Sequence, residues 1–266
     1  PMMHPICWQP CSDEDFLLTA FCALILFSVF NGLPAESRVE AGPVALVPAA
    51  ALVAADKEQD REDRMVLNRY FQVSKKNILR GVIMVAHFAG RLPKMEKSAT
   101  LDAKRHVNKE GVIEYDTTDR QGDVTIQKYL IATFINGEME NSGKDTSKVA
   151  VTRDNYKFKY KGKREKDGRP VFVFEINPRK NREGLFKGEI WLDSDTGLTV
   201  REAGRFVKSP SVFLKKVYFA REYTIRDGFA VPKLIQTAIE TRFWGLAELD
   251  IQYSGFTWED HQAELN

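Results

Sequence analysis

Residues 156–176 read YKFKYKGKREKDGRPVFVFEI, two runs on either side of the pair Asp167-Gly168. In the first run aromatic residues alternate with lysines, which is typical of a strand with one buried and one exposed face. The second run, from Val171 to Ile176, is apolar on both faces with one acidic interruption. Because an Asp-Gly pair between such runs is the strongest short-range hairpin signal, this stretch predicts two antiparallel strands.

The same signal recurs toward the C-terminus. The turns and their neighbouring runs are Asp195-Thr196-Gly197 after 188–193, Asp227-Gly228 after 217–225, and Gly245 between 234–243 and 247–253. These runs last roughly ten residues, well above the usual ~5–6. Long antiparallel strands in series twist and coil, and such meanders close or partly close into barrels.

The N-terminal half of this region adds strands and two helices. Strands are predicted at 78–88, 101–107 and 112–116 from their β-branched or alternating composition. Helices are predicted at Asp56–Asn77 and Asp123–Asn136, each with its first aspartate as N-cap, and the second ending at Gly137. The sequence therefore predicts a mainly β (α+β) fold: an incomplete antiparallel up-and-down barrel, or a strongly curved sheet, with two helices as plug or lid.

The segment 1–55 differs from the rest and is predicted to be a signal peptide or membrane anchor followed by a linker. Residues 16–30, FLLTAFCALILFSVF, carry no charge and have the length of a signal-peptide core. The acidic triplet 13–15 stands where a signal peptide is normally basic, so a buried helix of a cytosolic fold is the alternative. We expect a periplasmic or otherwise exported protein, anchored through residues 16–33 if that segment is retained. Residues 56–266 then form a single domain.

Two motifs in the C-terminal half resemble those of a known family. Residues 189–201, EIWLDSDTGLTVR, have the shape apolar-Trp-apolar-Asp, a turn with Thr, then Arg; residues 227–232, DGFAVP, have a turn glycine followed by a proline. Together with residues 253–256 they resemble bacterial outer-membrane lipoprotein-sorting proteins, relatives of the periplasmic lipoprotein carrier. The motif residues are Trp191, Asp193, Thr196, Arg201, Gly228 and Pro232.

The resemblance implies a fold, a ligand class and a location. An incomplete barrel would hold acyl chains of a lipid or lipoprotein in an apolar cavity beneath a helical lid, without a cofactor. The second partner that the resemblance implies is a protein of the cell envelope. Association with the membrane would be peripheral or through the N-terminal segment. The alternative is a structural or sensory envelope domain that binds a protein and whose core is filled.

The apolar faces of the long strands supply the candidate cavity lining, with packed core as the competing interpretation. The candidates are Phe172, Phe174, Ile176, Ile190, Leu192, Ile235, Ile239, Phe243, Leu249, Ile251 and Tyr253. On the helices, residues at helical spacing are the candidate lid contacts. They are Val66, Tyr70, Ile126, Leu130 and Phe134.

The residue inventory argues against an enzyme. The cysteines Cys7, Cys11 and Cys22 all lie near the N-terminus, and no two histidines have the i, i+3 or i+4 spacing of a helical metal site. There is no G-x-S-x-G motif and no glycine-rich phosphate loop. We therefore expect no catalytic residue, no metal and no cofactor. The net charge of +2 is too small to predict nucleic-acid binding, although basic clusters at 179–187 and 201–216 suit anionic headgroups or an acidic partner.

Overall fold

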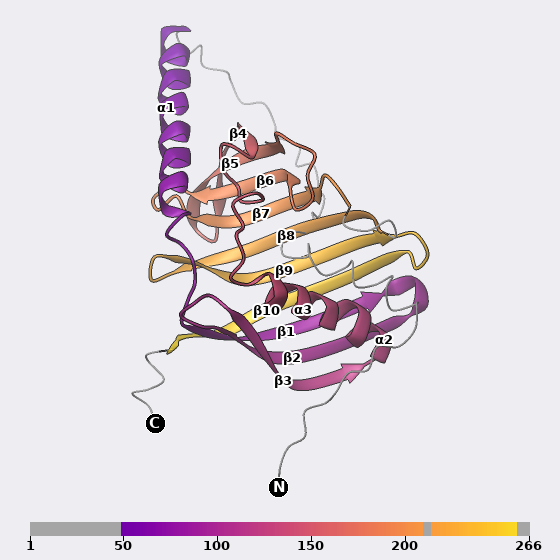
Figure 1. Cartoon of the computed structure of the whole chain (residues 1–266). Helices are drawn as coiled ribbons and strands as arrows, with labels where there is room; N and C mark the ends of the chain where they lie inside the picture. The colour runs from indigo at the N-terminus through magenta and orange to yellow at the C-terminus, as the bar shows by residue number, and fades with distance from the viewer. Residues whose placement is uncertain (1–48, 210–213, 260–266) are drawn as a thin grey trace.

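Ten antiparallel strands form one open sheet in the computed structural model, which describes residues 49–209 and 214–259 (Figure 1). The strands are β1 Val82–Leu92, β2 Lys97–Val107, β3 Ile113–Gly122, β4 Tyr156–Lys166, β5 Arg169–Pro178, β6 Phe186–Asp193, β7 Thr199–Phe206, β8 Leu214–Arg226, β9 Phe229–Thr241 and β10 Leu246–Trp258. Their order across the sheet is β3-β2-β1-β10-β9-β8-β7-β6-β5-β4. The meander is therefore broken once, where β10 returns to pair with β1.

Strands β3 and β4 are the two edges, and the sheet is not closed between them. Edge strand β4 carries the alternating lysines, which discourage pairing with another chain. The predicted mainly β class, with an open curved antiparallel sheet and two helical segments, is confirmed.

Several predicted boundaries are corrected. The strand expected at 78–88 runs from Val82 to Leu92, and the one expected at 234–243 ends at Thr241. Helix α1 spans Ala49–Val73, so Asp56 lies inside it and is not its N-cap. Apolar, alanine-rich sequence before Asp56 has good helix propensity, which explains the earlier start.

The second helical segment comprises α2 Val124–Ile126, a π-helical turn at Gln127–Ile131 and α3 Ala132–Asn141. The Asp123 carboxylate accepts bonds from the backbone N–H groups of Thr125 and Ile126, which confirms the predicted N-cap. Gly137 does not end the helix: it is buried within α3.

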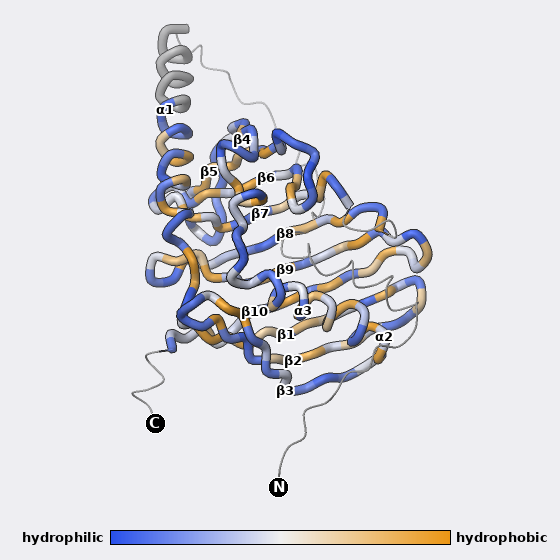
Figure 2. The backbone as a smooth tube through the Cα atoms, in the orientation of Figure 1, coloured by the Kyte–Doolittle hydropathy of each residue, from blue (hydrophilic) through white to orange (hydrophobic). Residues whose placement is uncertain are grey.

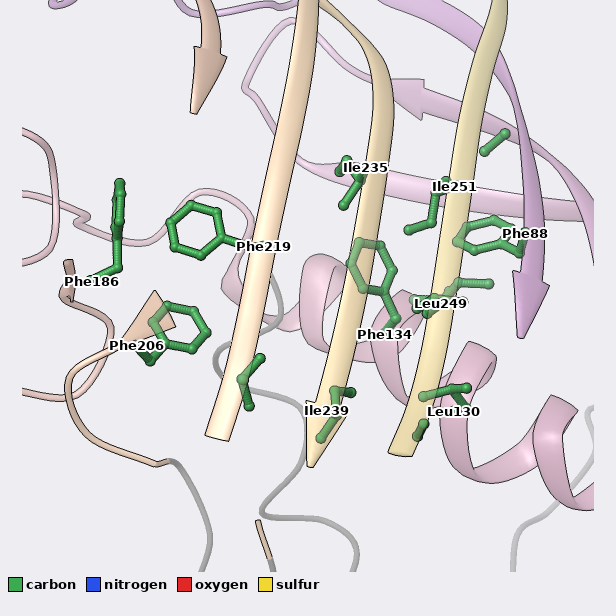
Figure 3. Close-up of a cluster of buried hydrophobic side chains, with 14 of the residues drawn as sticks. Phe88, Leu130, Phe134, Phe186, Phe206, Phe219, Ile235, Ile239, Leu249 and Ile251 are labelled. Atoms are coloured by element: carbon green, nitrogen blue, oxygen red, sulfur yellow. The ribbon is translucent and has the colours of Figure 1, made fainter. Parts of the chain in front are cut away.

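This segment lies across one face of β1–β3 (Figure 1). Gly90 allows the close approach, because a Cβ at that position would lie 2.6 Å from Cγ2 of Ile126. Phe134 packs against Phe88, with ring centroids 6.0 Å apart. Figure 3 shows these side chains meeting Leu249 and Ile251 of β10. The helical segment is thereby fixed to the sheet by a continuous apolar contact.

Helix α1 contacts the opposite end of the sheet, and its N-terminal part projects beyond the strands (Figure 1). Val66 and Tyr70 are buried near its C-terminal end. Arg69 donates from Nη1 to the carbonyl oxygen of Ser194, in the β6–β7 turn. Figure 2 shows hydrophobic and hydrophilic residues interspersed along the part of α1 that meets the sheet.

Candidate functional site

Most of the predicted cavity residues are packed core. Nine of them are at most 5% exposed and belong to one continuous cluster: Phe172, Phe174, Ile176, Ile190, Leu192, Ile235, Ile239, Leu249 and Ile251. All five predicted lid residues are buried in the same cluster. Figure 3 shows side chains of the helical segment, such as Leu130 and Phe134, lying against those of the sheet, such as Leu249 and Ile251.

Two predicted lining residues lie elsewhere. Phe243 is 67% exposed in the turn between β9 and β10, so the prediction that it lines an interior cavity is wrong. The reason is the early end of β9 at Thr241, which takes Phe243 out of the strand alternation. Tyr253 is partly buried and borders a pocket that is lined by residues of β1, β8, β9 and β10.

A buried ion pair joins α3 to the sheet. Arg105 of β2 donates from Nε and Nη2 to the two carboxylate oxygens of Glu138, at 3.0 and 2.9 Å. The two side chains are only 9% and 7% exposed. The hydroxyl of Tyr115 donates to the same carboxylate, and the Arg105 guanidinium lies 5.9 Å from the ring centroid of Tyr253. Bidentate geometry of this kind is the strong form of an ion pair.

Burial raises the pKa of Glu138, but the Arg105 charge and the bonds from Arg105 and Tyr115 outweigh it, so the net shift is downward. The carboxylate is therefore ionised at neutral pH. The pKa of Tyr253 is raised by burial and by the nearby Glu138 charge, so its hydroxyl stays protonated.

A second polar cluster lies on the same face, in β7 and β8. Arg221 forms a 3.7 Å ion pair with Glu202, and the Tyr223 hydroxyl donates to the same carboxylate at 3.2 Å. Burial raises the pKa of Glu202, while Arg221 and Tyr223 oppose the rise. The two clusters set polar groups at defined points of an otherwise apolar face.

The sheet opens between β9 and β10. Their ladder ends at the pair Leu234 and Gln252. Beyond it, residues 229–232 pair with β8, and residues 253–254 and 257–258 pair with β1. A register shift in the β1–β10 ladder, together with Gly255 at φ +59°, bends β10 away. We call this opening the fork. At its outer end the Trp258 indole donates to the Asp227 carboxylate at 3.1 Å.

A pocket of about 320 Å³ occupies the fork. Its apolar lining residues, here called the apolar wall, are Met84, Val231, Pro232, Tyr253 and Phe256. The other lining residues are Thr224, Arg226, Lys233, Ser254 and Gly255. Met84 and Tyr253 contact the buried Arg105, so the inner end of the pocket adjoins the α3 ion pair. Among the described residues neither Arg226 nor Lys233 has a carboxylate within 4.0 Å. The fork pocket therefore combines an apolar wall with two uncompensated positive charges.

One of the two family-like motifs builds this fork. Gly228, at φ +78°, completes the β8–β9 turn. Asn77 holds that turn, donating to the Gly228 carbonyl at 2.9 Å and accepting from the Ala230 N–H at 3.0 Å. Pro232 lacks an N–H and is unsuited to a fully paired central strand, but here β9 has no partner on its β10 side. The proline thus marks the position of the fork.

The other motif builds a turn away from the pocket. The buried Asp193 carboxylate accepts from the backbone N–H and hydroxyl of Thr196, at 2.8 and 2.7 Å, and pairs with Arg169 at 3.2 Å. Trp191 lies on the sheet surface, with the Arg201 guanidinium 5.6 Å from its ring centroid. Arg201 is also paired with Glu222. These residues stabilise the β6–β7 hairpin and do not line the fork pocket.

Replacing Asp193 with Asn is expected to destabilise the fold by about 1–2 kcal/mol at pH 7. Burial raises the pKa of Asp193, but its bonds to Thr196 and its pairing with Arg169 give a net lowering. A carboxyl group whose pKa is lower in the folded than in the unfolded state stabilises the fold at pH values above its unfolded-state pKa. This contribution is lost as the pH falls through the folded-state pKa. Urea unfolding should therefore show the parent and variant converging in acid. A difference that stays constant down to acid pH would contradict this assignment.

Sequence patterns did not identify the groups that distinguish the site: Met84, Arg105, Glu138, Arg226 and Lys233. One signal was available, because Arg105 shares the apolar face of its strand with Leu101, Ala103 and Val107. A charged residue on such a face requires a buried partner. The partner Glu138 lies far along the chain on a helix, and nothing in local spacing identifies it.

Among residues 49–209 and 214–259 no group of three or more His, Cys, Asp or Glu is arranged to hold a metal ion. Within the same residues, no helix has both the length and the apolar character needed to cross a bilayer. The predicted signal or anchor at residues 16–33 lies outside the described part of the chain.

Comparison with solved structures returns low-identity matches. A DUF1329 family protein from Desulfovibrio piger is 14% identical, with a TM-score of 0.36 over 74% of this chain and 92% of its own. A putative outer membrane lipoprotein-sorting protein domain from Vibrio parahaemolyticus is also 14% identical, with a TM-score of 0.36 over 73% of this chain and 92% of its own. A LolA superfamily protein from Nitrosomonas europaea is 12% identical, with a TM-score of 0.33 over 73% and 92%.

The matches include the group that the sequence motifs resemble. No protein-family model matches the chain, and no curated protein matches it either.

Proposed function

We propose that this is a non-enzymatic protein of the cell envelope that binds an acyl chain, and that the fork pocket receives it. The observation that carries the proposal is the pairing of an apolar wall with Arg226 and Lys233 in one pocket. An acyl chain with an anionic head group matches both halves of that lining. The chain would lie against Met84 and Phe256, and the head group would meet the two cations.

The pocket volume of about 320 Å³ is at the lower end of the range for small-molecule sites. It therefore suits one chain, or part of one, and not a lipid with several chains. Burial of each methylene would contribute about 0.8 kcal/mol to binding. A larger cargo would require α3 to move from the sheet, which would break the pair between Arg105 and Glu138.

The location is part of the proposal. Residues 16–30 have the composition of an export signal. We accordingly place the mature protein in the periplasm or an equivalent exported compartment.

The double substitution Arg226→Gln and Lys233→Gln is expected to weaken binding of a fluorescent fatty acid by about tenfold, because two charge-assisted contacts to the carboxylate are lost. Binding of the uncharged methyl ester should change little. The matched control is Lys159→Gln with Arg205→Gln, two exposed cations on strands β4 and β7. Equal affinity of parent and variant for the fatty acid would refute this orientation of the ligand.

A second candidate is supported by two observations. The apolar residues on one face of the sheet are buried in one continuous cluster, and the fork leaves backbone N–H and C=O groups of β9 and β10 without a ladder partner. An extended peptide could pair with these edges, as in strand addition to a sheet. This function corresponds to a protein-binding envelope domain. Fatty-acid binding that no peptide displaces, and that Arg226→Gln weakens, would favour the acyl-chain proposal over the peptide-binding one.

A further inference from the structure

The turn between β9 and β10 presents an apolar tip to solvent. Phe243 is 67% exposed, Trp244 42% and Leu246 39%. Met95, in the short η3 helix at Pro93–Met95, is 44% exposed, and η3 contacts β10. We call these four residues the aromatic tip. Exposed large apolar side chains gathered at one place usually mark an interaction surface.

The tip is held in a defined shape. The backbone N–H and the hydroxyl of Thr241 both donate to the Gly245 carbonyl at 2.8 Å. The same hydroxyl accepts from the Trp244 N–H at 3.0 Å. Gly245 has φ +79°, which closes the turn. Little conformational freedom of the backbone therefore remains to be lost when the tip binds.

Positive charge accompanies the apolar side chains. Arg242 is exposed beside Phe243, and the side chain of Lys94 lies against Gly245. Within the described residues neither cation has a carboxylate within 4.0 Å. The acidic residue Glu240 is paired with Lys216, while Glu96 is exposed near Met95. The tip thus carries a small positive excess.

Aromatic residues beside arginine and lysine are the composition of groups that rest in a membrane interface. Trp and Phe place their rings among the head groups, and cations attract anionic lipid. We propose that the aromatic tip docks the protein on a bilayer that contains anionic lipid, with Phe243 and Trp244 inserted at the head-group level. This surface lies at the opposite end of β9 from the fork, so it is independent of the acyl-chain proposal.

The test is quenching of tryptophan fluorescence in the full chain by brominated lipids, in vesicles of phosphatidylcholine with phosphatidylglycerol. Substituting Trp244→Phe is expected to lower the quenching clearly, whereas the control Trp191→Phe, on the sheet surface, does not lower it. Because the chain contains four tryptophans, the difference in quenching between the parent and Trp244→Phe is what reports contact of Trp244 itself. Equal quenching in parent and Trp244→Phe would overturn the proposal.

A second arm tests the charge. The double substitution Arg242→Gln and Lys94→Gln should lower Trp244 quenching on phosphatidylglycerol vesicles toward its level on pure phosphatidylcholine. The pair Phe243→Ser and Trp244→Ser should weaken vesicle partitioning by about tenfold, because binding scales with inserted apolar area. Val85→Ser, which removes an exposed apolar side chain elsewhere, is the control. Identical partitioning of the tip variant and this control would also overturn the proposal.

Discussion

Replacing Glu138 with Ala is expected to lower the free energy of unfolding by about 3–5 kcal/mol, because it leaves the Arg105 guanidinium buried without its counter-charge. The effect should exceed that of ordinary surface substitutions several-fold. Urea or guanidinium unfolding, followed by circular dichroism, measures it. The matched control is Glu140→Ala, since Glu140 is exposed on the same helix.

The double variant Arg105→Met with Glu138→Leu distinguishes the lost ion pair from a merely disturbed helix. It replaces both charged groups with apolar ones of similar size, and such replacements are often neutral or stabilising. We therefore expect the double variant to recover most of the stability. A double variant as unstable as Glu138→Ala would mean that the damage comes from packing and not from an unpaired charge.

Replacing Ser254 with Trp is expected to weaken fatty-acid binding by about thirtyfold, since the indole would fill space otherwise taken by two or three methylenes. Ser254 lines the fork pocket and is itself exposed, so the fold should tolerate the larger side chain. Titration with a fluorescent fatty acid gives the affinity, and the midpoint of thermal unfolding checks the fold.

Gln121→Trp serves as the control for this substitution, because Gln121 is exposed on edge strand β3 and lines no part of the pocket. It introduces the same side chain at a distant position. If Ser254→Trp binds the fatty acid as tightly as Gln121→Trp, the fork pocket is not the binding site.

The strands and hairpins could be predicted from the sequence because their signals are local. Alternation in 156–161 and Asp-Gly at 167–168 set the β4–β5 hairpin, and the structure pairs these strands as expected. Helix ends were less predictable. Gly137 has the residue type of a helix terminus, yet tertiary packing carries α3 past it to Asn141.

The candidate site was less accessible to sequence reasoning. Apolar alternation identifies a buried face, but it cannot distinguish a cavity wall from packed core, and Phe174 and Ile239 are core. The fork arises because β10 leaves β9 to follow β1, a long-range choice that no local pattern encodes. Only Pro232 hinted at it, as a proline in a strand that would otherwise be central.

Photo-crosslinking of the full chain with a diazirine-bearing fatty acid tests the central claim most directly. After digestion, mass spectrometry locates the labelled residues. We predict labels on residues 253–256 and 231–233, competed by unlabelled fatty acid and reduced by Ser254→Trp. Labels confined to other parts of the chain, or labelling that unlabelled fatty acid does not compete, would contradict the assignment of the fork pocket as an acyl-chain site.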